Sequence, residues 1–171
     1  MKYRRLVFVL AIVVFNAILA NATTVRRLTF DDLVSKASTI VQGHVINTNT
    51  AWTDDHKLIL TTYTLAVDER IKGATGQQTV TITSIGGQVG NKILHVSGMP
   101  AFAQGESAVV FLEQSGKYST VVGLSQGKFS VQNGQVANST AGLDFSGGAT
   151  ATAIKMPIDE FKRQIRLRLS K

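Results

Sequence analysis

The alternation of apolar and polar residues predicts a chain built mainly of short β-strands. The clearest case begins at Ile59, where Thr61, Tyr63 and Leu65 recur at every second position opposite a polar face. This period of two is typical of a strand with one buried and one solvated face. Residues 108–112 are apolar at every position, so we expect them to form the central strand of the sheet.

Glycine-rich turns separate the other predicted strands. These strands span residues 40–46, 79–85, 118–124, 128–131 and 135–136. The polar stretch 48–57 is predicted to be a turn or hairpin loop. The longest irregular segment is predicted at residues 87–104. Many short strands at close spacing favour a small barrel or sandwich.

A helix is predicted near each end of this mainly β domain. Thr29 is a candidate N-cap, and Asp32 three residues later approximates a capping box. Pro157 stands where a second helix would begin. Apolar residues then follow at spacings of three, four and four: Ile158, Phe161, Ile165 and Leu169. Basic residues surround this stripe, so the helix either packs on the core or lies on an anionic membrane; the narrow stripe favours core packing.

The first 22 residues have the three parts of a secretory signal peptide. A basic front at 2–5 precedes an apolar run, Leu6 to Ala20, and Ala20-Asn21-Ala22 forms a small-x-small cleavage site. The rival is a retained membrane anchor, but 15 residues interrupted by Asn16 are short of the ~20 that a spanning helix needs. We therefore predict a secreted or periplasmic protein, cleaved near Ala22, that contacts the membrane only through this segment before cleavage.

The predicted organisation is a signal peptide at 1–22, a β-barrel domain at 23–136, a loop or linker at 137–156 and a helix packed on the barrel at 157–171. The chain has no cysteine, which excludes disulfides, and small secreted eukaryotic domains usually rely on disulfides. A bacterial envelope or extracellular protein fits better. The signal carries three of the 18 basic residues and none of the 11 acidic ones, so its loss lowers the formal charge from +7 to +4. These charges are scattered, and we expect no nucleic-acid partner.

One motif matches a catalytic signature by its letters. Gly123-Leu124-Ser125-Gln126-Gly127 reads as the G-x-S-x-G nucleophile elbow, which requires a strand before it and a helix after it. Strand-like residues follow instead, and no Asp and then His come downstream. A strand with a glycine-rich kink is therefore the preferred interpretation of this segment. A serine hydrolase that uses Ser125 is the less favoured alternative.

The other candidate chemistry is weak. The chain has three histidines and no H-E-x-x-H motif, so we predict no metal site and no cofactor. Gly86-Gly87-Gln88-Val89-Gly90 lacks the Lys-Ser/Thr and the helix of a phosphate loop, so a turn or barrel-corner kink is preferred.

Two loops carry the candidate binding residues. The turn near residue 54 holds Trp52, Asp54 and His56, and the irregular segment 87–104 holds Met99 and Phe102. Long loops on a rigid scaffold are where binding commonly occurs. Trp52 is either an exposed aromatic that stacks on a ligand or a hairpin anchor, and the anchor is favoured.

Short motifs in a fixed order complete the picture. They are I-V-Q-G-H-V at 40–45, T-T-Y-T at 61–64, I-K-G at 71–73, G-G at 86–87, P-A-F at 100–102, G-E at 105–106, F-L at 111–112 and the segment 123–129. This order resembles a family of uncharacterised exported bacterial proteins. More distantly it is similar to the OB-type barrel of netrin-like and tissue-inhibitor-of-metalloproteinase domains. The resemblance implies an OB-like barrel, but the inhibitors use an N-terminal cysteine that this chain lacks, so it implies no inhibition and no site residues.

The sequence therefore predicts a mainly β, non-enzymatic, exported domain with a binding or structural role in the bacterial envelope. Its partner would be a protein or a glycan of the envelope or the medium. A protease-inhibitor-like module is the alternative from a different functional class.

Overall fold

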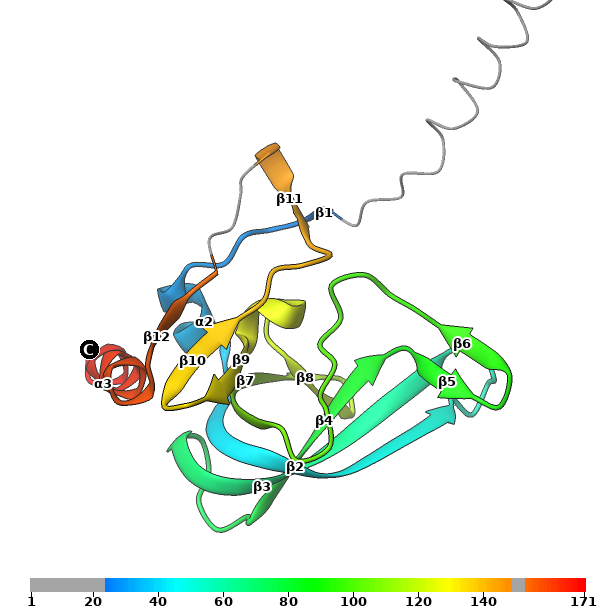
Figure 1. Cartoon of the computed structure of the whole chain (residues 1–171), viewed down its shortest axis with the longest axis horizontal. Helices are drawn as coiled ribbons and strands as arrows, with labels where there is room; N and C mark the ends of the chain where they lie inside the picture. Colours follow the sequence, from blue (N-terminus) through cyan, green and yellow to red (C-terminus); the bar gives the residue numbers. More distant parts are fainter. Residues whose placement is uncertain (1–23, 149–152) are drawn as a thin grey trace, which may run out of the picture.

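A computed structural model describes residues 24–148 and 153–171 of the chain. The predicted signal segment 1–22 lies outside the described residues. The fold is mainly β, with a helix near each end of the domain, which confirms the predicted fold class (Figure 1).

Most strands belong to one eight-stranded sheet. Its members are β2 (Thr39–Trp52), β3 (Ile59–Lys72), β4 (Thr79–Ile85), β7 (Ser107–Ser115), β8 (Tyr118–Val121), β9 (Lys128–Gln132), β10 (Gln135–Asn138) and β12 (Lys155–Pro157). They are hydrogen-bonded in the order β12-β10-β9-β7-β2-β3-β4, and β8 pairs with β7.

Four short strands form two smaller sheets. β1 (Thr24–Val25) pairs in parallel with β11 (Asp144–Phe145), and β5 (Gly87–Val89) forms a hairpin with β6 (Lys92–Leu94). The helices are α2 (Phe30–Lys36) and α3 (Ile158–Leu169), with two 3-10 turns, η2 (Leu124–Gly127) and η3 (Ser146–Gly148).

The main sheet curls toward a barrel but does not close. β4 and β8 lie next to each other, yet no ladder of hydrogen bonds joins them. A cleft of about 440 Å³ opens at this seam, and Gln78, Gln114 and Ser119 are among its lining residues. The small barrel expected from the sequence is thus an open one.

Two hydrophobic cores lie on opposite faces of β7. Val109 and Phe111 point into the core beneath the helices, whereas Ala108, Val110 and Leu112 point into the interior of the curled sheet. All five residues are at most 2% exposed. β7 lies between β9 and β2, so the prediction that 108–112 forms the central strand is confirmed.

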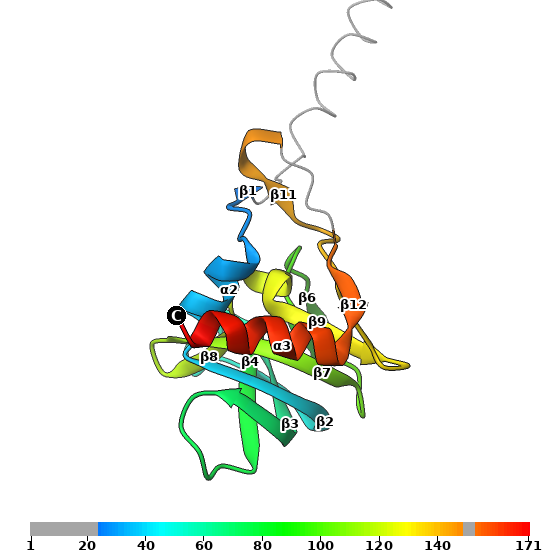
Figure 2. The same ribbon diagram turned by 90° about the vertical axis from the view of Figure 1, so that its left-hand side faces the viewer.

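The helices cover the face of the sheet formed by β7 and β9. The predicted capping box of α2 is present: Thr29 Oγ1 accepts from the Asp32 N–H, and the Asp32 carboxylate accepts from the Thr29 N–H. On α3, Phe161 is fully buried, and its ring lies 4.5 Å from the ring of Phe129. α3 therefore packs on the core as expected (Figure 2).

Ion pairs fix α3 against the rest of the domain. The Glu69 carboxylate on β3 accepts from Lys162 Nζ at 2.6 Å and also from Arg166. These hydrogen bonds, led by the one from Lys162, lower the pKa of Glu69. Arg168 pairs with Asp31 of α2. Neither helix of the described ranges is long and apolar enough to cross a membrane.

The hairpin of β2 and β3 is longer than the sequence predicted. Residues 48–52 were expected to be part of a turn, but β2 continues to Trp52, and the turn occupies only 53–58. The polar residues of this stretch remain in a strand because β3 pairs with them along its length. The backbone hydrogen bonds between the strands do not depend on side-chain polarity. A solvated stretch of strand such as 48–52 can therefore lack the apolar alternation by which strands are predicted.

Three other predicted segments differ in detail. The irregular segment 87–104 contains the hairpin of β5 and β6, and the predicted linker 137–156 contains β11 and most of β12. β12 pairs with β10, so this part of the segment is held by backbone hydrogen bonds that composition does not reveal. The predicted strand 118–124 ends at Val121, because Gly123 and Leu124 adopt left-handed backbone angles and η2 follows.

The core beneath α3 yields a stability prediction. Phe161→Ala removes a fully buried ring that contacts Phe30, Phe111 and Phe129. The free energy of unfolding in a denaturant titration should fall by about 3–5 kcal/mol. Leu167→Ala, on the same helix but at a side chain that is 52% exposed, should change it by less than about 0.5 kcal/mol. Equal losses in the two variants would contradict this account of the core.

Candidate functional site

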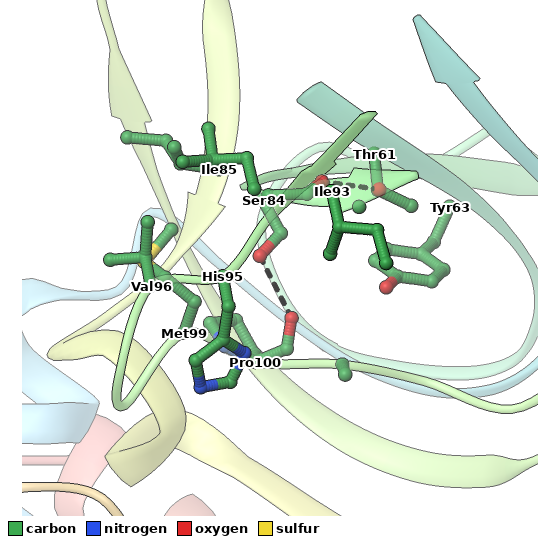
Figure 3. A pocket seen from close by; sticks show the side chains of 13 residues that line it. Thr61, Tyr63, Ser84, Ile85, Ile93, His95, Val96, Met99 and Pro100 are labelled. Atoms are coloured by element: carbon green, nitrogen blue, oxygen red, sulfur yellow. Dashed lines mark hydrogen bonds between the residues drawn. The ribbon is translucent and has the colours of Figure 1, made fainter. Parts of the chain in front are cut away.

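An apolar cleft of about 270 Å³ opens where β3 begins and β4 ends, beside the β5–β6 hairpin (Figure 3). Residues 93–101 form its outer wall, and Thr61, Tyr63 and Ser84 contribute to its inner wall. Two isoleucines of the cleft remain exposed to solvent, Ile85 at 37% and Ile93 at 71%. Large apolar side chains at such exposure beside a cavity are typical of a binding surface.

The polar side chains of the inner wall are already hydrogen-bonded to the protein. Thr61 Oγ1 donates to the Gly86 carbonyl at 2.6 Å and lies 3.0 Å from Thr50 Oγ1. Ser84 Oγ donates to the Pro100 carbonyl at 2.8 Å. Burial raises the pKa of Tyr63, which is 6% exposed. These groups fix the shape of the wall, and the surface left for a ligand is largely apolar.

Two glycines allow the hairpin to fold over the cleft. Gly86 and Gly87 have φ of +116° and +131°, angles that L side chains rarely adopt. A Cβ on Gly87 would lie 2.4 Å from Thr61 Oγ1 and 2.6 Å from Thr50 Cγ2. The predicted glycine turn is therefore also the point at which β5 lies closest to β2 and β3.

A partly buried ion pair holds the segment that leads from the cleft back to β7. Glu106 Oε1 accepts from Lys128 Nζ at 2.8 Å and from Ser130 Oγ at 2.6 Å, and Oε2 accepts from the Ala103 N–H at 2.9 Å. Lys128 also donates to the Ala101 carbonyl and lies 4.5 Å above the ring of Phe102. Burial by itself would raise the pKa of Glu106, but these hydrogen bonds outweigh it and lower the pKa.

The β2–β3 turn forms a second, smaller feature. The Trp52 ring stacks on the His56 ring, with 6.4 Å between centroids, and His56 adopts a positive φ. Asp55 accepts from Thr53 Oγ1 at 2.6 Å and from the Lys57 N–H, and the Thr53 hydrogen bond is the main cause of the lowered pKa of Asp55. The turn is thus ordered by its own contacts.

The structure separates the five predicted binding residues. Trp52 is the last residue of β2 and adjoins the turn that holds Asp54 and His56, and Met99 lines the apolar cleft. Phe102 is 8% exposed and packs 4.9 Å from the Tyr63 ring, so it belongs to the core.

Ile85 and Ile93 of the cleft were not among the predicted site residues. Ile93 lies in a short apolar run within the segment 87–104, which the sequence did indicate as a candidate binding loop.

Comparison with known proteins adds nothing to this geometry. No family model, curated protein or solved structure matches the chain.

The G-x-S-x-G segment at 123–127 connects the N-terminal segment of the described chain to the rest of the domain. Gln126 accepts from the Leu28 N–H at 2.9 Å and donates to the Arg26 carbonyl at 3.2 Å, which binds the N-terminal segment to the domain. Ser125 Oγ is buried and has no hydrogen-bond partner among the described residues. β9 follows η2, so the described residues supply neither the helix of a nucleophile elbow nor a base at hydrogen-bond distance from Ser125.

The three histidines lie in three different places. His44 Nδ1 is 3.0 Å from Asp68 Oδ1, His56 belongs to the β2–β3 turn, and His95 lines the apolar cleft. No group of three potential metal ligands occurs in the ranges 24–148 and 153–171.

The lowered pKa of Glu106 gives a pH prediction. The Glu106–Lys128 pair stabilises the fold fully above the ordinary Glu pKa near 4.5, and this contribution is lost as the pH falls through the lower folded-state value. Glu106→Gln should therefore reduce the free energy of unfolding by about 1–3 kcal/mol at pH 7. The difference from the wild type should shrink below about pH 4.5.

Thermal unfolding followed by circular dichroism between pH 3 and pH 7 measures this difference. Glu113→Gln, which removes the same charge at a half-exposed position of β7, is the control for a change of charge alone. A constant gap between wild type and Glu106→Gln over this range would show that the ionised carboxylate has no such role.

Proposed function

We propose that this chain is an exported, non-enzymatic binding domain that captures a protein partner at the apolar cleft. The observation that carries the proposal is the exposure of Ile93 beside a cleft whose wall hydroxyls are already hydrogen-bonded. The basic, apolar and small-x-small parts of residues 1–22 support export, with cleavage near Ala22 and a location in the bacterial envelope or the medium.

The cleft suits an apolar side chain of a partner protein. Full burial of an exposed isoleucine contributes about 1.5–3 kcal/mol, and Ile93, which is 71% exposed, can gain most of this on binding. The inner wall is fixed by the hydrogen bonds of Thr61 and Ser84, and the adjoining segment by Glu106 and Lys128. A pre-formed surface loses little conformational entropy on binding, which favours affinity.

The two alternative functions have less support from the described site. A serine hydrolase would need Ser125 Oγ hydrogen-bonded to a base, and it has no such partner in the described ranges. A protease-inhibitor-like module would be a special case of protein binding, so the identity of a captured partner distinguishes it from a scaffold.

Affinity capture with a matched pair of variants tests the proposal. The tagged full-length chain is produced in an exporting bacterium and used to recover proteins from envelope and medium fractions. Ile93→Lys places a charge at the rim of the cleft, whereas Leu167→Lys places the same charge on α3 at the other end of the molecule (Figure 1). A partner recovered by the wild type and by Leu167→Lys should fall at least tenfold with Ile93→Lys, because the lost burial exceeds about 1.4 kcal/mol.

Equal recovery by the two lysine variants would show that the cleft is not the binding surface. If the wild type recovers no protein from either fraction, the proposal of a protein partner fails.

A further inference from the structure

A second surface, which shares only Ile85 with the lining of the cleft, lies on the outer face of β2, β3 and β4. Successive strand residues point to opposite faces, and Tyr63, Leu65 and Ile82 point into the core. Their neighbours therefore point outward. In register across the three strands, the outward rows are Asn47–Thr64–Thr81, Asn49–Thr62–Thr83 and Ala51–Leu60–Ile85. The first two rows are named here the Thr/Asn face.

Neither helix packs across the Thr/Asn face. α2 and α3 cover the sheet at β7 and β9, and α3 is held to β3 further along the strand, at Glu69 (Figure 2). Asn47, Asn49 and Thr81 are exposed, and Thr62 and Thr64 are half-buried. Thr83 is 8% exposed. Five of the six side chains thus reach solvent substantially.

The side chains of the Thr/Asn face are not used by the protein. None of the six makes a side-chain hydrogen bond to another described residue, whereas Thr50, Thr61 and Ser84, on the same three strands, are all bonded. A hydroxyl offers one donor and two acceptor sites, and an amide offers both kinds of group. The face therefore presents an array of unoccupied donors and acceptors.

The Thr/Asn face is also free of charge. No residue of the three rows is ionisable, although the whole chain carries 18 basic and 11 acidic residues. The ionisable pair His44 and Asp68 lies beyond one end of the rows, and the turn with Asp55 and Lys57 lies beyond the other. An anionic ligand would find no cation within the rows, and a protein partner would find no aromatic or arginine anchor.

From this combination we infer that the Thr/Asn face binds a neutral polysaccharide chain. Sugar hydroxyls donate and accept hydrogen bonds as threonine and asparagine side chains do, and they need no opposite charge. Side chains repeat about every 4.8 Å across the strands and about every 6.8 Å along them, which offers a periodic ligand several contacts at once. Ala51 and Leu60, which lie side by side in the third row, add an apolar strip for the C–H faces of the sugar rings.

Affinity electrophoresis of the full-length chain tests this inference. Native gels contain hydroxyethyl cellulose or dextran as neutral probes, and carboxymethyl cellulose as an anionic probe with the same backbone as the first. Thr62→Val with Thr64→Val removes two hydroxyls and retains side chains that favour strands. Thr39→Val with Thr120→Val is the matched control on β2 and β8, outside the face.

The wild type and the control should be retarded by at least one neutral polymer, and 0.5 M salt should leave that retardation unchanged. The Thr62/Thr64 variant should lose at least tenfold in apparent affinity. Thr81→Lys, at an exposed position where folding is not at risk, should show the same loss.

Three results would overturn the inference. They are no retardation by either neutral polymer, retardation by carboxymethyl cellulose alone, and equal retardation of the wild type and the Thr62/Thr64 variant. Thermal unfolding of each variant shows whether its fold is retained. The capture experiment with Ile93→Lys tests the cleft and not the Thr/Asn face, because Ile93 lies outside the three rows. Either proposal can therefore fail while the other holds.

Discussion

Burial of β7 on both faces is the constraint on which the rest of the domain depends. Each fully buried side chain on this strand contributes about 1.5–3 kcal/mol, and the two cores draw on alternate residues of the same nine-residue segment. Val109 and Phe111 hold the helices, while Val110 and Leu112 hold the curled sheet. A change in the register of β7 by one residue would exchange these two sets and remove both cores at once.

This arrangement leaves the two proposed binding surfaces at the end of the sheet that lies away from the helices. The helices and their ion pairs to Glu69 and Asp31 cover the sheet around β7 and β9. Beyond β2, the β5–β6 hairpin and residues 95–104 fold over the inner face, and in the described ranges neither helix packs across the Thr/Asn face. The apolar cleft and the Thr/Asn face are therefore the two sides of one end of the domain, and Tyr63 joins the wall of the cleft to the core.

Strong periodicity made much of the fold predictable, and contacts between distant residues account for what was missed. The alternation from Ile59, the apolar run at 108–112 and the stripe from Ile158 each correspond to a strand or helix with the expected buried face. The Asn133–Gly134 turn joins β9 and β10 through two positive φ angles, as its residues predict. In contrast, β11 and β12 depend on pairing with β1 and β10, which no local pattern encodes.

The candidate site was harder to predict than the fold. Trp52 and Met99 were identified from loop position and side-chain type, but Phe102 has the same signals and is in the core. The requirement for glycine at position 43 is also a tertiary effect, since a Cβ there would lie 2.2 Å from the Ala66 carbonyl oxygen. The absence of charge on the Thr/Asn face becomes visible only when three strands are placed in register.

Native-state hydrogen exchange tests most directly the claim that one strand supports both cores. If β7 belongs to both, the backbone amides of Val109, Val110 and Phe111 should exchange only by global unfolding. The amides of β2 and of the core helix α3 should then approach the same free energy of opening. Exchange of the β7 amides through a smaller opening, with one core lost while the other stays protected, would contradict the account.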